Sequence, residues 1–116
     1  MKRIISLIVI CLMLTACGSK YETIATNEAL ELIDKGAIVI DVRSLDEYNE
    51  GHIKGAINIP VDEIESITYD KDKTLILYCA TGVRSAKASN MLADMGYTSL
   101  YNLDGGLLNW GSDLEE

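Results

Sequence analysis

The chain is poor in cations, proline and phenylalanine, and each shortage excludes a class of protein. Its 10 Lys and Arg stand against 18 Asp and Glu, which gives a formal net charge of -8. Nothing therefore predicts a basic nucleic-acid-binding surface. Phe is absent and Pro occurs once, whereas Ile, Leu and Val are plentiful, so disorder is expected at most near the ends. A length of 116 residues allows one domain with a single small core.

The first residues predict a targeting signal rather than part of the fold. A basic start at 1–3 precedes an almost unbroken apolar run from Ile4 to Leu14, which is too short for an ordinary transmembrane helix. Leu-Thr-Ala-Cys at 14–17 then resembles the lipobox of bacterial lipoproteins. The resemblance implies a signal peptide over residues 1–16, acylation of Cys17 and an extracytoplasmic, membrane-anchored protein. A plain signal peptide or an uncleaved anchor is the alternative.

Removal of this signal would leave one free thiol in the protein. Residues 1–16 contain Lys2 and Arg3 but no acidic residue, so their removal takes the net charge from -8 to -10. Cys11 would be discarded and Cys17 acylated, so only Cys79 would remain as a thiol and no internal disulfide could form. One His and one thiol cannot complete a zinc site, and we expect neither a metal nor a cofactor. A lone thiol outside the cytoplasm suggests chemistry on its sulfur, with a buried inert cysteine as the alternative.

After a tether at 17–21, strand and helix patterns alternate along one domain at 22–116, which predicts an α/β fold with a parallel sheet. Capping patterns place Thr26 as one helix N-cap, and Ser44 with Glu47 as a capping box. The strands are expected near residues 21–25, 37–40, 57–59, 74–78 and 99–103. The helices are expected near 26–35, 44–50, 61–67, 86–95 and 107–110, with a turn-rich connection at 51–56.

The most informative stretch is 74–85, an apolar run that ends at Cys79 and is followed by a glycine-containing loop and a helix. A strand that stops where a helix begins surrounds the cysteine sulfur with free backbone N–H groups. These amides and the helix dipole stabilise an anion there. Since the thiolate is the reactive form of cysteine, the pattern predicts that Cys79 is a nucleophile.

Several motifs together resemble a single rhodanese domain over about residues 22–114. They are Asp-Val-Arg at 41–43, Glu47-Tyr48 with the segment 51–60, the loop 79–85, and Asn-Leu-Asp-Gly-Gly at 102–106 with Trp110. The resemblance implies a three-layer fold with about five short parallel strands and helices on both faces. It also implies that Cys79 takes sulfane sulfur from thiosulfate, a persulfide or a polysulfide, and passes it from a Cys79 persulfide to cyanide or a thiol.

The same resemblance implies roles for the residues of the loop. Backbone amides from Ala80, Thr81, Gly82, Val83 and Arg84 would surround the persulfide. Gly82 lets the loop bend tightly, and Arg84 adds a charge that can fork onto an anion or onto loop carbonyls.

Residues outside the loop are expected to support it. The resemblance makes Asp41 a partner of the loop, and Arg43 is expected to pair with Glu47. Ser85 is expected to be a helix N-cap. His52 is the one histidine in the chain and is expected to be structural rather than catalytic.

The spacing of Cys79 and Arg84, the lack of a nearby second cysteine and the charge of the loop bear on the alternative functions. Cysteine phosphatases have five residues between cysteine and arginine, whereas here 80–83 are four, a smaller ring that suits a sulfur better than a phosphate. A dithiol oxidoreductase would need a second cysteine near Cys79. A non-enzymatic persulfide carrier or binding module is the stronger alternative. Because Arg84 is the only cation of the loop, the donor is expected to be a persulfide or polysulfide. We expect a monomer.

Overall fold

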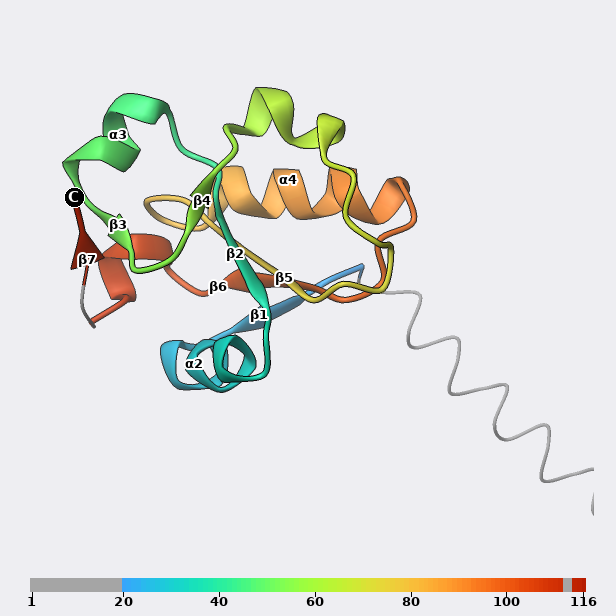
Figure 1. Cartoon of the computed structure of the whole chain (residues 1–116), viewed down its shortest axis with the longest axis horizontal. Helices are drawn as coiled ribbons and strands as arrows, with labels where there is room; N and C mark the ends of the chain where they lie inside the picture. The colour runs from blue at the N-terminus through green and yellow to red at the C-terminus, as the bar shows by residue number, and fades with distance from the viewer. Residues whose placement is uncertain (1–19, 112–113) are drawn as a thin grey trace, which may run out of the picture.

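The computed structural model describes residues 20–111 and 114–116, and its centre is a parallel five-stranded sheet (Figure 1). The strand order is β1-β6-β5-β2-β4, and every pairing in it is parallel. The strands are β1 (Glu22–Ile24), β2 (Ile38–Asp41), β4 (Ile57–Asn58), β5 (Leu75–Tyr78) and β6 (Leu100–Leu103). The helices are α2 (Thr26–Asp34), α3 (Leu45–Glu50), α4 (Val83–Asp94), and the 3-10 helices η1 (Val61–Ser66) and η2 (Gly106–Asn109).

Helices cover both faces of the sheet, which confirms the expected α/β class and its five-stranded parallel sheet. On one face α4 and η1 pack against alternate side chains of the strands, through Ala88, Leu92 and the fully buried Ile64. On the other face α2 and the segment around η2 pack through Ala29 and Trp110. Strands that are buried on both faces have continuous apolar sequences, and β2 before Asp41 and β5 before Cys79 show this pattern.

The period of two along β5 decides where Cys79 points. Leu75, Leu77 and Cys79 belong to the core beneath α4, whereas Ile76 and Tyr78 belong to the core beneath α2. Side chains alternate across a strand, so the sulfur emerges on the α4 face. The chain then turns directly into α4, which brings the N-terminus of this helix to the cysteine.

Two local expectations were wrong. Thr26 is not an N-cap: Ala25 holds that position and its N–H donates to Glu28 Oε1. Because α2 abuts the C-terminal segment, the Thr26 hydroxyl donates to the carbonyl of Trp110 at 3.0 Å. The connection 51–56 contains a short strand, β3 (His52–Ile53), which pairs antiparallel with β7 (Leu114–Glu115). The helix expected near 61–67 is present as the 3-10 helix η1, with its apolar Ile64 fully buried.

The expected signal peptide at 1–16 and Cys17 lie outside the described residues. No helix in the described part of the chain is long and apolar enough to cross a membrane.

Candidate functional site

Cys79 directly follows β5 and lies where the backbone turns into α4. Its side chain is buried, with 1% of the residue exposed. The turn is made by Gly82, the N-cap of α4, at φ +105. This left-handed conformation favours glycine, and it directs the N–H of Gly82 to Cys79 Sγ at 3.1 Å. The predicted strand, loop and helix therefore hold the sulfur at a helix N-terminus.

Hydrogen bonds to the sulfur together lower the pKa of Cys79 by more than burial raises it. Burial is the largest single influence and raises the pKa of the Cys79 thiol. The Ser85 hydroxyl and the backbone N–H groups of Ser85, Gly82 and Thr81 act in the opposite direction, and the net pKa lies below its usual value. Donors aimed at a charged sulfur favour its ionised form.

Ser85 is not the N-cap that the sequence predicts. Helix α4 begins two residues earlier, at Val83, and Ser85 is fully buried in its first turn. From there its Oγ lies 3.6 Å from Cys79 Sγ and donates to Asn102 Oδ1 on β6. Nδ2 of Asn102 in turn donates to the carbonyl of Gly82 at 3.4 Å. The Ser85 hydroxyl therefore lies between the sulfur and Asn102 and does not cap the helix.

The segment after β6 is hydrogen-bonded to the backbone of the loop. The N–H of Leu107 donates to the carbonyl of Cys79 at 2.8 Å, and the N–H of Leu108 donates to that of Ala80 at 3.2 Å. Gly106 makes this approach possible, because a Cβ at its position would lie 2.4 Å from the carbonyl oxygen of Cys79. Asn102 and Gly106 are site residues without an assigned role in the sequence prediction. An Asn within an apolar strand and a Gly-Gly pair just beyond it were the available signals.

The loop cation is bound to a carboxylate. Arg84 forks onto Glu47 of α3, with Nη1 to Oε1 at 2.8 Å and Nη2 to Oε2 at 3.0 Å. This contact, helped by the bonds from Ser44, lowers the pKa of Glu47 to about 2. The expected pairing of Glu47 with Arg43 is therefore wrong. Both side chains of the observed pair are partly exposed, at 41% and 36%, so the pair contributes little to stability.

Arg43 pairs instead with Asp41 on the opposite face of the sheet. The guanidinium donates to both carboxylate oxygens and, through Nη2, to the carbonyl of Gly51 at 2.7 Å. Burial and the Asp41 carboxylate raise the pKa of Tyr78, which lies on the same face. A buried charge is tolerated when it is paired and hydrogen-bonded. Through Arg43, Asp41 is thus linked to the C-terminal end of α3 at Gly51, and any support of the loop by Asp41 is indirect.

Of the remaining expected residues, Thr81 and Val83 belong to the segment 79–85 and His52 belongs to β3. Thr81 and Val83 are exposed, with Val83 at 74%. His52 is buried and its ring stacks on Tyr48 at a centroid distance of 3.7 Å. Among residues 20–111 and 114–116, no three acidic, His or Cys side chains are grouped so that they could hold a metal ion.

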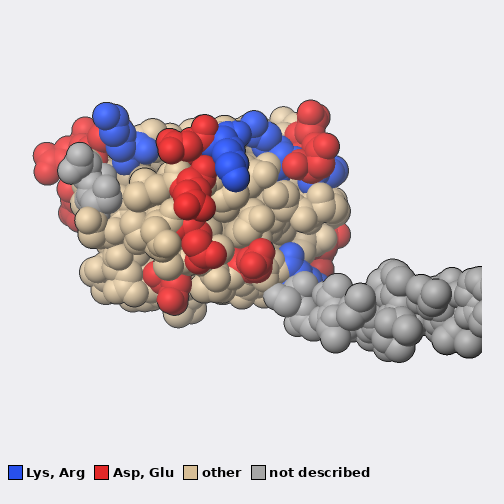
Figure 2. Space-filling model, turned by 90° about the horizontal axis from the view of Figure 1, so that it is seen from below, with Lys and Arg blue, Asp and Glu red and all other residues tan. Residues whose placement is uncertain are grey.

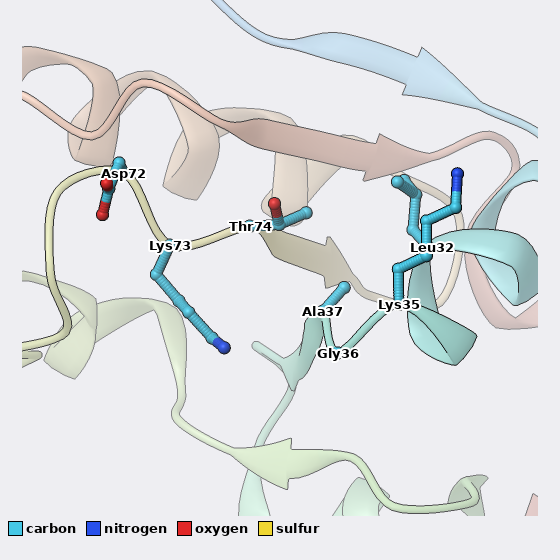
Figure 3. Close-up of a pocket in the computed structure, with 7 residues that line it drawn as sticks. All are labelled: Leu32, Lys35, Gly36, Ala37, Asp72, Lys73 and Thr74. Atoms are coloured by element: carbon cyan, nitrogen blue, oxygen red, sulfur yellow. The ribbon is translucent and has the colours of Figure 1, made fainter.

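Two surface hollows lie apart from the sulfur. One, of about 320 Å³, lies between the C-terminus of α2 and the start of β5 (Figure 3). Its Lys35 and Lys73 point away from each other, so they do not converge on a common ligand. The other, of about 370 Å³, lies beside η1. Neither is lined by the loop 79–85.

Comparison with known proteins gives consistent matches. The family model described as "Rhodanese-like domain" matches residues 25–113. "Thiosulfate sulfurtransferase GlpE" of Coxiella burnetii is 36% identical over 93 residues, which covers 78% of this chain and 87% of that protein. "Uncharacterized protein YqhL" of Bacillus subtilis is 38% identical over 92 residues, covering 78% and 73%. A rhodanese-related protein of Thermoplasma volcanium superposes with a TM-score of 0.72 at 32% identity, covering 82% and 98% of the two chains.

Proposed function

This chain belongs to the rhodanese-like domain family, and on that basis we propose that it is a sulfurtransferase that carries sulfane sulfur on Cys79. The observation that carries the proposal is the environment of Sγ. A buried sulfur at the N-terminus of α4 receives the Gly82 N–H and lies beside the Ser85 hydroxyl. Such preorganised donors stabilise a thiolate, the form of Cys79 that attacks a sulfur donor.

The proposed reaction has two steps through one covalent intermediate. The Cys79 thiolate attacks the outer sulfur of a donor R–S–S⁻, forms a new S–S bond and expels R–S⁻. Cyanide, or a thiolate acceptor, then attacks the outer sulfur of the Cys79 persulfide, and the S–S electron pair returns to Sγ as the thiolate. Sulfur is transferred and the enzyme is unchanged, as in other covalent catalysis.

The donor class follows from the pairing of Arg84. Thiosulfate brings two negative charges, and Glu47 already occupies the guanidinium that would receive them. The chain is also acidic overall, and acidic side chains run across the middle of the face seen from below, the side on which α2 lies (Figure 2). Such a field opposes a dianion more than a monoanion. We therefore propose a persulfide or polysulfide as the preferred donor.

Glu47→Gln is expected to shift this preference. Loss of the carboxylate leaves Arg84 free to receive an anionic donor, so kcat/KM for thiosulfate is expected to rise by about tenfold, equivalent to about 1.4 kcal/mol of transition-state binding. The value for glutathione persulfide, a donor with one charge on its reacting sulfur group, is expected to change much less. Steady-state cyanide assays with both donors measure the ratio.

The matched control is Glu50→Gln, which removes another acid from α3 and changes the net charge equally. An equal rise in both variants would show that overall charge, and not the Arg84 pair, sets the preference.

The proposal is tested by sulfur loading of the wild-type protein. After incubation with glutathione persulfide and removal of the donor, the peptide that contains Cys79 is expected to gain the mass of one sulfur atom. Cyanide is expected to remove it with release of one thiocyanate per protein. Peptide mass spectrometry distinguishes Cys79 from Cys11 and Cys17. No added sulfur at Cys79 with any sulfane donor would refute the proposal, and loading that cyanide cannot discharge would indicate a carrier for a specific partner.

The place of action is also a proposal. The sequence of residues 1–17 supports anchoring of the protein through an acylated Cys17 outside the cytoplasm. The thiol of Cys79 would then be the only one available, and its sulfur would pass to an acceptor outside this chain.

A further inference from the structure

One hydroxyl proton at the site faces two acceptors. Ser85 Oγ donates to Asn102 Oδ1 and also lies 3.6 Å from Cys79 Sγ, yet a serine hydroxyl has a single proton. The orientation of the Asn102 amide is set by its other partner. The carbonyl of Gly82 can only accept, so Nδ2 must face it, and Oδ1 is left to face Ser85.

The charge on the sulfur decides which acceptor receives the proton. When Cys79 is a thiol, its S–H can donate to Ser85 Oγ while Ser85 donates to Asn102. When Cys79 is a thiolate, rotation about the Cβ–Oγ bond of Ser85 turns the proton toward the sulfur, since bonds to charged acceptors are the stronger ones. Asn102 Oδ1 then loses its donor although Asn102 is only 6% exposed, which costs free energy.

We propose that Asn102 and the Cys79 sulfur compete for the Ser85 proton, so that Ser85 donates to the sulfur only while the sulfur is charged. Ser85 touches the reacting atom and is a catalytic residue, whereas Asn102 acts through it as a positioning residue. In the reaction proposed above, on which this part rests, the Cys79 sulfur loses its charge as the S–S bond forms. The Ser85 hydroxyl then donates its hydrogen bond to Asn102 again, so it is not left buried without an acceptor. The competition also keeps the thiolate from being overstabilised, which would weaken it as a nucleophile.

The charged groups around the sulfur are paired and independent of this chain of hydrogen bonds. Arg84 on α4 is bound by Glu47 of α3, and Asp41 on β2 is bound by Arg43 on the opposite face of the sheet. Substitutions at Ser85 and Asn102 leave all four in place. In variants that add no charge, a change in the ionisation of Cys79 therefore reports on the hydroxyl.

The test measures the rate of iodoacetamide alkylation at Cys79 against pH in the full chain, followed by peptide mass spectrometry. Ser85→Ala is expected to raise the pH midpoint by about one unit, because the thiolate loses a hydrogen bond that is stronger than one to a neutral acceptor. Ser89→Ala is the matched control: Ser89 is also fully buried in α4, but its hydroxyl donates to the carbonyl of Ser85. Its midpoint is expected to stay at the wild-type value. Equal midpoints in all three proteins would overturn the proposal.

Asn102 variants test the competition itself. Asn102→Leu removes the rival acceptor, so the midpoint is expected to fall by about half a unit and the plateau rate at high pH to decrease. Asn102→Asp keeps the size and adds a stronger, charged acceptor, so its midpoint is expected to rise by about one unit. If Asn102→Leu raises the midpoint as Ser85→Ala does, Asn102 only holds the serine in place and the competition is refuted. If the leucine variant does not fold, an aspartate variant with the wild-type midpoint refutes it.

Alkylation needs no sulfane donor. Its outcome therefore stands apart from that of sulfur loading: the wild-type protein can fail to take up sulfur while the midpoints still shift as expected, or take up sulfur while they do not.

Discussion

Replacing Cys79 with serine is expected to reduce sulfur transfer from glutathione persulfide to cyanide by at least about a thousandfold, to the uncatalysed background. A serine hydroxyl in the same place is almost fully protonated and cannot hold a persulfide. The two other cysteines, Cys11 and Cys17, lie outside the 25–113 match to the family. The measurement is thiocyanate formation by the full chain under saturating donor.

The fold of the same variant is expected to be retained. Serine is close in size to cysteine, and its hydroxyl can accept from Gly82 N–H and donate to Ser85, the two groups that surround Sγ. The free energy of unfolding from urea titration is expected to change by no more than about 1 kcal/mol. Transfer at the wild-type rate by Cys79→Ser would place the nucleophile at another residue.

Gly106→Ala is expected to destabilise the protein by about 2–5 kcal/mol and to abolish loading at Cys79. The residue has φ +62, where a Cβ costs about 1–2 kcal/mol. The Cβ would also lie 2.4 Å from the carbonyl oxygen of Cys79 and 2.7 Å from that of Ala80, and backbone atoms cannot move aside as a side chain can. Overpacking of this kind adds about 1–3 kcal/mol. Either η2 or the loop must shift, and both support the sulfur.

Gly55→Ala separates conformational strain from this close approach. Gly55 also has a left-handed φ, +82, but nothing lies within 4 Å of the added Cβ. Its destabilisation is expected to stop at about 1–2 kcal/mol, with loading of Cys79 unchanged. Urea titration and peptide mass spectrometry measure both quantities. If the two variants lose the same stability and both load sulfur, then the approach of η2 to the loop is not what requires glycine at 106.

Predictions from sequence succeeded where the determinant was local. The capping box of Ser44 and Glu47 is present as predicted, with reciprocal bonds of 3.2 and 3.1 Å. Both partners lie within one turn of helix, so the backbone brings them together regardless of the rest of the fold. The same holds for the left-handed Gly82 that turns β5 into α4.

The predicted pair of Arg43 and Glu47 failed because the fold, and not the spacing of charges in the chain, selects the partners. Arg43 and Glu47 are close in sequence, yet Arg43 pairs with Asp41, and Glu47 pairs with Arg84, 37 positions away. Strand β2 extends to Asp41, one residue beyond the predicted end. Alternation along the strand then puts Asp41 on the face away from the loop, where Arg43 meets it. A pattern of charges in sequence does not specify which face each one occupies.

The sequence alone determined the family and predicted Cys79 as the nucleophile, because a strand, a cysteine, a short glycine-containing loop and a helix are consecutive in the chain, and their geometry is set by the backbone. Only the tertiary structure decided what surrounds the sulfur. The register of β6 beside β5 brings Asn102 to Ser85, and the return of the chain brings Gly106 against the carbonyl of Cys79. These contacts join residues 17 or more positions apart, and depend on how the layers pack rather than on local propensity.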